Sequence, residues 1–219
     1  MALSWWFILT GASVGGDMGG MAMGPPPFGA IVLMWWVMMA AMMLPSAAPA
    51  ILLYARVRQM RRAERSVAQT WVFLVGYLIL WLVFSLLAAA AQQVVAGQSM
   101  AIESTAAKGS LLIVAGAYQL SPLKSACLGE CRAPAQFISR YWRPGWTGAL
   151  RLGLLHGAYC VGCCWALMLL LFVGGVMNLL WVVALAAIVA AEKLVPHGQW
   201  LARLTGITLI AWGVALLLF

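Results

Sequence analysis

Apolar residues occur along the chain in seven runs that are separated by short polar or basic segments. The runs cover roughly residues 3–16, 31–54, 70–95, 109–123, 147–173, 178–195 and 200–219. A helix needs about 20 apolar residues to cross the ~30 Å hydrocarbon core of a bilayer. We therefore expect an all-α bundle of six or seven transmembrane helices that forms a single domain over residues 1–219. The first and fourth runs are short for a span, and it stays open whether residues 3–16 cross fully.

The composition indicates that lipid, and not water, surrounds most of this chain. Of its 219 residues, 65% are hydrophobic and 8% are charged, and the mean hydropathy is +0.98. A soluble domain of ordinary composition has about 25% charged residues. The formal net charge of +8 does not indicate nucleic-acid binding, because five arginines between Arg56 and Arg65 lie in one short segment between apolar runs. Loops of this kind fix the orientation of membrane proteins.

The basic residues predict which loops face the cytoplasm, since cytoplasmic loops are enriched in Lys and Arg. Alternating the runs across the bilayer places residues 55–69, 124–146 and 196–199 on that side. With their flanks, these segments hold every basic residue except Lys108. We therefore expect a multi-pass membrane protein with a cytoplasmic N-terminus. With seven spans, the C-terminus is periplasmic or extracellular.

The second run contains methionines at helical spacing. Four of them form two neighbouring stripes and are candidate metal ligands: Met38 with Met42, and Met39 with Met43. A methionine stripe is more often a packing surface, and for these residues alone packing is the favoured interpretation. Pro45 and Pro49 follow, and each of them favours a kink because proline removes a backbone hydrogen bond from the helix.

The fifth run combines thiols with an imidazole on one helical face. The spacing of four and eight residues places His156, Cys160 and Cys164 on the same side, with Cys163 beside them. This combination favours metal ligation over packing. At ~1.5 Å rise per residue, the thiols reach the same depth as the methionines of the second run, in the outer half of the bilayer. Gly153 and Gly157 form a GxxxG pair, which lets another helix approach closely.

The ligand types favour a soft metal ion. Thiolate and thioether sulfur suit Cu(I), whereas thiolate with imidazole also suits Zn(II). The chain has only 5 Asp and Glu residues, too few for a typical Mg or Ca site. Three methionines of the outer loop could capture copper first: Met18, Met21 and Met23.

Cys127 and Cys131 form a second thiol pair on the cytoplasmic side, and a metal site, a disulfide and chance spacing all stay open for them.

Glu192 is an ionisable residue close to the membrane interior, which marks it as a candidate functional residue. The alternative for Glu192 is an interfacial ion pair with the adjacent Lys193.

Three motifs together resemble a bacterial family of integral membrane proteins that are predicted to bind metal and that include copper chaperones encoded beside tyrosinases. The motifs are Trp35-x-x-Met38-Met39-Ala40-Ala41-Met42-Met43-Leu44-Pro45, Tyr118-Gln119-Leu120-Ser121-Pro122-Leu123-Lys124 with Cys127-x-x-x-Cys131, and His156-Gly157-x-Tyr159-Cys160-x-Gly162-Cys163-Cys164-Trp165. The resemblance runs from about residue 30 to residue 195. It implies metal handling by these methionines, cysteines, His156 and Glu192, with delivery of copper to a partner. It also implies a location in the bacterial inner membrane.

We therefore predict a Cu(I) chaperone or transfer protein, without enzymatic activity, that supplies a partner cuproenzyme. One alternative is a membrane thiol-disulfide oxidoreductase that uses Cys163–Cys164 and Cys127–Cys131 as disulfides. The other alternative is a non-catalytic subunit or scaffold of a larger complex.

Overall fold

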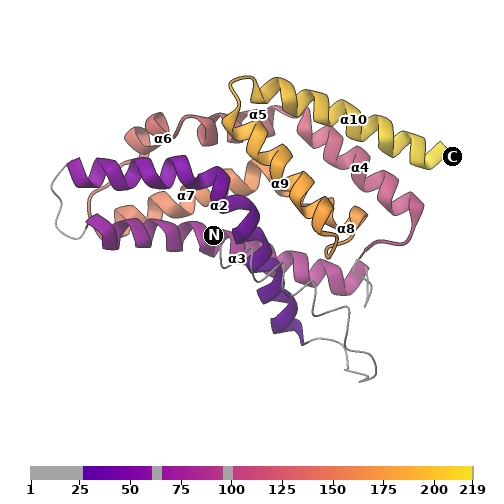
Figure 1. Cartoon of the computed structure of the whole chain (residues 1–219), viewed down its shortest axis with the longest axis horizontal. Helices are drawn as coiled ribbons and strands as arrows, with labels where there is room; N and C mark the ends of the chain where they lie inside the picture. Colours follow the sequence, from indigo (N-terminus) through magenta and orange to yellow (C-terminus); the bar gives the residue numbers. More distant parts are fainter. Residues whose placement is uncertain (1–26, 61–65, 96–100, 219) are drawn as a thin grey trace.

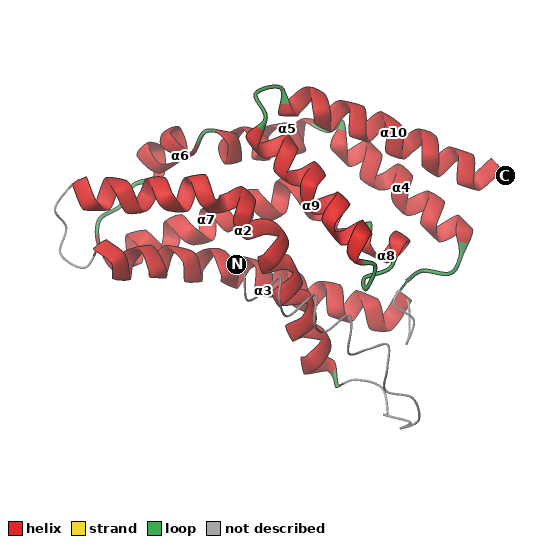
Figure 2. Ribbon diagram, viewed as in Figure 1, coloured by secondary structure: helices red, strands yellow, loops and turns green. Residues whose placement is uncertain are grey.

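The computed structural model describes residues 27–60, 66–95 and 101–218, and every regular element in these ranges is a helix, as expected (Figures 1 and 2). The helices are α2 (Phe28–Met60), α3 (Ser66–Val95), α4 (Thr105–Gln119), α5 (Pro122–Arg132), α6 (Pro134–Tyr141), α7 (Gly145–Leu169), α8 (Leu171–Gly174), α9 (Leu179–Leu194) and α10 (Gly198–Leu218). The predicted run 3–16 and the outer-loop residues Met18, Met21 and Met23 lie outside the described residues.

The expected count of six or seven spans is wrong for the described part of the chain. Four helical stretches there are long and apolar enough to cross a membrane: Phe28–Met60, Val67–Val94, Gly145–Gly174 and Gly198–Leu218. The run 178–195 gives only the 16 residues of α9, which reach about 24 Å at ~1.5 Å per residue and fall short of the ~30 Å core. Asn178 caps this helix at its start, and Val195 is already extended.

The run 109–123 is interrupted by a bend of 62° between α4 and α5, so the two helices count as a fifth span only if they are taken together. The sequence Ser121-Pro122 produces the bend. Proline cannot donate the hydrogen bond that would continue α4, but it is well suited to the first turn of a new helix. The hydroxyl of Ser121 accepts a hydrogen bond from the Lys124 amide and caps α5.

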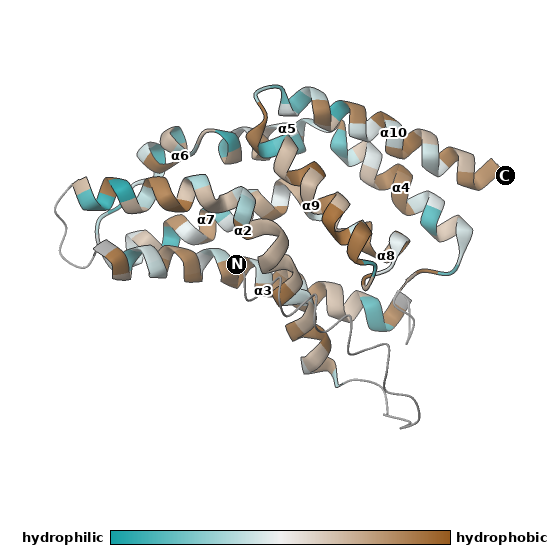
Figure 3. Ribbon diagram, in the orientation of Figure 1, coloured by the Kyte–Doolittle hydropathy of each residue, from teal (hydrophilic) through white to brown (hydrophobic). Residues whose placement is uncertain are grey.

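The outer surface of the bundle is apolar. On α3, the most exposed side chains recur every four residues, and five of them form one stripe: Trp71, Val75, Ile79, Val83 and Leu87. Apolar residues are also frequent along α9 and α10 (Figure 3), and several of them are exposed, among them Leu180 and Leu204. A continuous apolar surface of this kind is unfavourable in water and is what a helix presents to lipid. Helices of this length and surface could span a membrane.

Glycines allow α3 and α7 to pack with their backbones in contact. A Cβ atom on Gly76 would lie 2.6 Å from the Leu150 carbonyl oxygen, and one on Gly157 would lie 3.1 Å from that of Tyr77. Gly153 faces the backbone of Phe73 in the same way. The close approach expected for the pair Gly153 and Gly157 is therefore confirmed, and the neighbouring helix is α3.

Helix α2 changes direction midway along its length (Figure 1). The change coincides with Pro45 and Pro49, both of which lie inside the helix. Side chains bind the backbone at the bend, because the Met43 carbonyl accepts hydrogen bonds from the Ser46 hydroxyl at 2.9 Å and the Tyr77 hydroxyl at 3.4 Å. At the bend, Met43 of α2 lies against α7, and its sulfur is 3.7 Å from that of Cys164.

Contacts also connect the three segments that we predict to be cytoplasmic. The Arg58 guanidinium lies over the Trp142 ring, 5.9 Å from its centroid. Arg132 donates to the backbone carbonyl of Glu192 at 2.7 Å and to that of Pro196. The ends of α2 and α9 thus both lie against the α5–α6 region, as an alternating topology requires. The side of the membrane on which these segments lie stays a prediction.

Candidate metal centre

Three thiols lie in one turn of α7, in the interior of the bundle. Cys160, Cys163 and Cys164 are each 1% exposed. The thiols of Cys163 and Cys164 donate hydrogen bonds to the backbone carbonyl of Cys160, at 3.1 Å and 3.0 Å. All five cysteines of the chain are free. The sulfurs are therefore available as ligands, and each one faces a different neighbouring helix.

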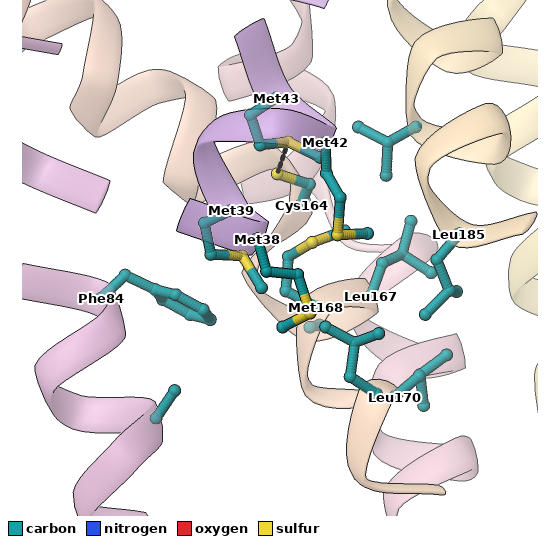
Figure 4. Close-up of a cluster of buried hydrophobic side chains, with 14 of the residues drawn as sticks. Met38, Met39, Met42, Met43, Phe84, Cys164, Leu167, Met168, Leu170 and Leu185 are labelled. Carbon is teal, nitrogen blue, oxygen red and sulfur yellow. Dashed lines mark hydrogen bonds between the residues drawn. The ribbon is translucent and has the colours of Figure 1, made fainter. Parts of the chain in front are cut away.

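Cys164 faces the bend of α2. Its Sγ lies 3.7 Å from the Sδ of Met43. The four methionines predicted as ligands are all buried, and their side chains gather around Cys164 and α7 (Figure 4). The structure thus places Cys164 and Met43 side by side. This agrees with the sequence-based expectation that the two residues lie at the same depth in the bilayer. Whether these sulfurs bind a metal stays a prediction.

Met168 belongs to the same cluster, although it was absent from the sequence prediction. It is fully buried and lies beside Met38 and Met42 in the cluster (Figure 4). Its spacing was a usable signal, because Cys160, Cys164 and Met168 follow one another at intervals of four residues. The cluster therefore has a thioether on α7 as well as those on α2.

Cys160 faces a polar environment on the other side of the cluster. The Lys193 ammonium of α9 lies 3.0 Å from its Sγ, and the Tyr77 hydroxyl of α3 lies 3.1 Å from it. The same ammonium donates to the Ser46 hydroxyl of α2 at 3.3 Å. Spacing within one helix cannot reveal this arrangement, because the four residues come from four separate helices.

Cys163 faces α5, where its Sγ lies 3.9 Å from that of Cys131. Cys127 also approaches α7, since a Cβ atom on Gly162 would lie 3.0 Å from the Cys127 sulfur. The spacing of four residues places both thiols of α5 on the side of that helix that faces α7. However, the thiol that Cys131 contacts is Cys163 of α7 and not Cys127. Both thiols of α5 are partly exposed, unlike those of α7.

His156 shares a helical face with the thiols but lies in a different environment. Its ring is surrounded by aromatic rings at centroid distances of 6.0 Å from Phe73, 5.8 Å from Tyr77 and 5.3 Å from Phe137. Its Nδ1 is buried and finds no hydrogen-bond partner in the part of the chain that the structure describes. Eight residues along a helix correspond to about 12 Å, so a common face does not place His156 beside Cys164.

The described residues contain no group of three or more His, Cys, Asp or Glu side chains that could hold a metal ion. Two close sulfur contacts join α7 to neighbouring helices, one between Cys164 and Met43 and one between Cys163 and Cys131. Such pairs offer two soft ligands each. This donor set is suited to Cu(I), which thiolates and thioethers favour, and not to a tetrahedral zinc site with four protein ligands.

Glu192 belongs to a separate buried network and is not paired with Lys193. One of its carboxylate oxygens lies 2.6 Å from the Lys124 ammonium, with both side chains 1% exposed. The other accepts a hydrogen bond from the Gln119 amide at 2.8 Å, and Lys124 also donates to Gln119. The network joins α4, α5 and α9. Lys193 is buried too, so the interpretation of an interfacial pair between neighbouring residues is wrong.

A comparison with protein-family models places these features in a known group. The model of the family PpoB2, described as a copper chaperone, matches residues 32–216. The chain belongs to this copper chaperone family. The match includes the methionines of α2 and all five cysteines, which agrees with the resemblance seen in the sequence motifs. Neither the curated proteins nor the solved structures include a match to the chain.

Membership of a copper chaperone family suggests copper as the metal that this protein handles and implies a non-catalytic role. It also suggests a copper-dependent protein as the recipient. Met18, Met21 and Met23 lie before the matched residues, so the family match does not extend to the predicted capture loop.

The buried network around Glu192 leads to a prediction about stability. We expect Glu192→Gln to lower the free energy of unfolding by about 3–5 kcal/mol, because it leaves the buried Lys124 ammonium without a counter-charge. The matched control is Glu130→Gln, which breaks the exposed ion pair between Glu130 and Arg140. That change should cost at most about 1 kcal/mol. Chemical unfolding of both variants in detergent micelles measures the difference, and equal effects would contradict the proposed role of the network.

Proposed function

We propose that this protein is a membrane-embedded Cu(I) chaperone that holds copper between α2 and α7. The observation that supports this proposal best is the 3.7 Å separation of the Cys164 and Met43 sulfurs within a buried cluster of thioethers. The two residues are far apart in the sequence and come from different helices. The buried carboxylate of Glu192 is bound to Lys124 and not to the cluster.

The chemistry of the pairs suggests how copper moves. Cu(I) exchanges between sulfur ligands by forming a bond to an incoming sulfur while a bond to an outgoing sulfur breaks, and no nucleotide is consumed. Cys163 and Cys164 are adjacent in the chain, and they contact Cys131 and Met43 respectively. The sulfurs therefore form a series from the bend of α2, through α7, to the partly exposed thiols of α5.

The direction of delivery follows from the predicted orientation. We propose that the methionine cluster receives copper from the outer face, where Met18, Met21 and Met23 precede α2 in the sequence. Delivery then goes to an outward-facing cuproenzyme, or to Cys127 and Cys131 on the cytoplasmic side. Thioethers are good first ligands in an oxidising compartment, because free thiols there are prone to oxidation. The protein lies in the bacterial inner membrane in this proposal.

Replacement of Met43 by leucine tests the copper site with little disturbance of the packing. Leucine and methionine are close in volume, and exchanges between them in a core usually cost less than ~1.5 kcal/mol. We expect Met43→Leu to weaken Cu(I) binding by about tenfold or more, which corresponds to ~1.4 kcal/mol. The matched control is Met60→Leu at the exposed end of α2, which should leave binding unchanged. Competition with a chromophoric Cu(I) chelator measures both affinities.

The proposal fails if the purified protein does not bind Cu(I), or if it binds as tightly after Cys160, Cys163 and Cys164 are all changed to serine. Binding that is lost in the serine variant but unaffected in Met43→Leu would exclude Met43 as a ligand.

Thiol-disulfide exchange is a second candidate function, favoured by the 3.9 Å separation of the Cys131 and Cys163 sulfurs. Formation of a disulfide between them would remove two protons and two electrons, which a membrane quinone could accept. This pairing joins two helices, α5 and α7. The disulfides that the sequence suggested, Cys163–Cys164 and Cys127–Cys131, would each lie within one helix.

Thiol alkylation distinguishes the two functions. For a copper chaperone, we expect bound Cu(I) to protect Cys131 and Cys163 from a maleimide reagent, because the metal occupies their sulfurs. A reductant should not increase the labelling of the freshly isolated protein. An oxidoreductase would instead show fewer free thiols before reduction and would recover them afterwards, without any effect of copper. Mass spectrometry of the labelled peptides identifies the cysteines.

A further inference from the structure

Lys193 is a buried cation without a carboxylate partner among the described residues. The side chain is 7% exposed. Its neighbour Glu192 points to a different part of the bundle and is bound to Lys124 and Gln119. Successive residues of a helix are separated by about 100° around the axis, which explains why adjacent charges have different partners. The ammonium of Lys193 therefore needs its counter-charge from elsewhere.

The Lys193 ammonium contacts Cys160, which is a candidate metal ligand, and Ser46, which binds the backbone at the bend of α2. Its Nζ lies 3.0 Å from the Cys160 sulfur and 3.3 Å from the Ser46 hydroxyl. Ser46 lies in the bend of α2, so the ammonium is held between α2 and α7, where we place the copper. A buried ammonium is costly unless it is paired and hydrogen-bonded. Of these two neighbours, only Cys160 can supply a negative charge, as a thiolate.

We propose that Lys193 is a specificity-determining residue that selects a monovalent metal ion for the thiol site. The inference rests on the proposed function and adds to it the reason for discrimination between Cu(I) and divalent metals. Cys160 with one further thiolate of α7 contributes two negative charges. One Cu(I) ion and the Lys193 ammonium contribute two positive charges, so the filled site is neutral. A zinc ion at the same two thiolates leaves one positive charge in the apolar interior, which is strongly unfavourable.

Charge is also conserved when Cu(I) replaces a thiol proton at the site. When Cu(I) enters, the sulfur–hydrogen bond of the second thiol breaks and a copper–sulfur bond forms. The proton leaves to water, and neither copper nor sulfur changes oxidation state. The net charge of the buried site is thus the same before and after copper binds. A divalent ion could reach neutrality only through a third thiolate or through removal of the lysine charge.

The test compares the metal preference of the full-length protein with that of Lys193→Met and Lys193→Arg, at constant pH in detergent micelles. Cu(I) and Zn(II) affinities are measured by competition with chelators of known affinity. We expect the wild-type protein and Lys193→Arg to favour Cu(I). In Lys193→Met, the ratio of Cu(I) to Zn(II) affinity should fall by about tenfold or more, because two thiolates now balance a divalent ion. Lys108→Met, at a lysine far from the thiols in the sequence, is the matched control.

Two results separate the inference from the proposed function. If the wild-type protein does not bind Cu(I), the proposed function fails. If it binds Cu(I) and Lys193→Met has the same metal preference as the wild type and Lys108→Met, the role of Lys193 is overturned while the chaperone function stands. Lys193→Gln is a second neutral variant that keeps a hydrogen-bond donor near Ser46. It should show the same change of preference, and it decides the question if the methionine variant does not fold.

Discussion

The contact between the bend of α2 and the thiol-bearing turn of α7 determines what the rest of this structure can do. Pro45 and Pro49 interrupt the hydrogen bonding of α2, and the Ser46 and Tyr77 hydroxyls bind the Met43 carbonyl at the bend. The Met43 sulfur thereby lies 3.7 Å from that of Cys164. The glycines of α7 hold α3 against its other side. The bend thus joins a thioether of α2 to the thiols of α7.

Sulfur ligands allow one cluster to act both as a hydrophobic core and as a metal site. Methionine and the neutral thiol of cysteine can be buried without a charged partner, whereas a carboxylate site would need costly compensation when empty. The methionines of α2 and Met168 therefore stabilise the helix contact whether or not copper is present. Lys193 is the exception in this apolar region, and its position beside Cys160 gives the site a fixed positive charge.

The sequence predicted the helical class and the inward-facing sulfurs, because periodicity determines which side of a helix a residue occupies. It also placed Met43 and Cys164 at one depth, and the structure brings their sulfurs together. The number of spans was overestimated because apolar runs do not reveal the bend at Ser121-Pro122 or the short length of α9. The spacing grouped His156 with the thiols because residues on one face of a helix can still be far apart along the helix axis. The contacts of Lys193 and Glu192 depend on the arrangement of several helices, which spacing within one helix cannot supply.

X-ray absorption at the copper edge of the Cu(I)-loaded protein tests the central claim most directly. We predict a first coordination shell of sulfur alone, with fewer sulfur ligands in Met43→Leu and no contribution from imidazole nitrogen. The aromatic surroundings of His156 are the reason for the last expectation. A shell with nitrogen or oxygen ligands that is unchanged when Cys164 and Met43 are replaced would contradict a copper site between α2 and α7.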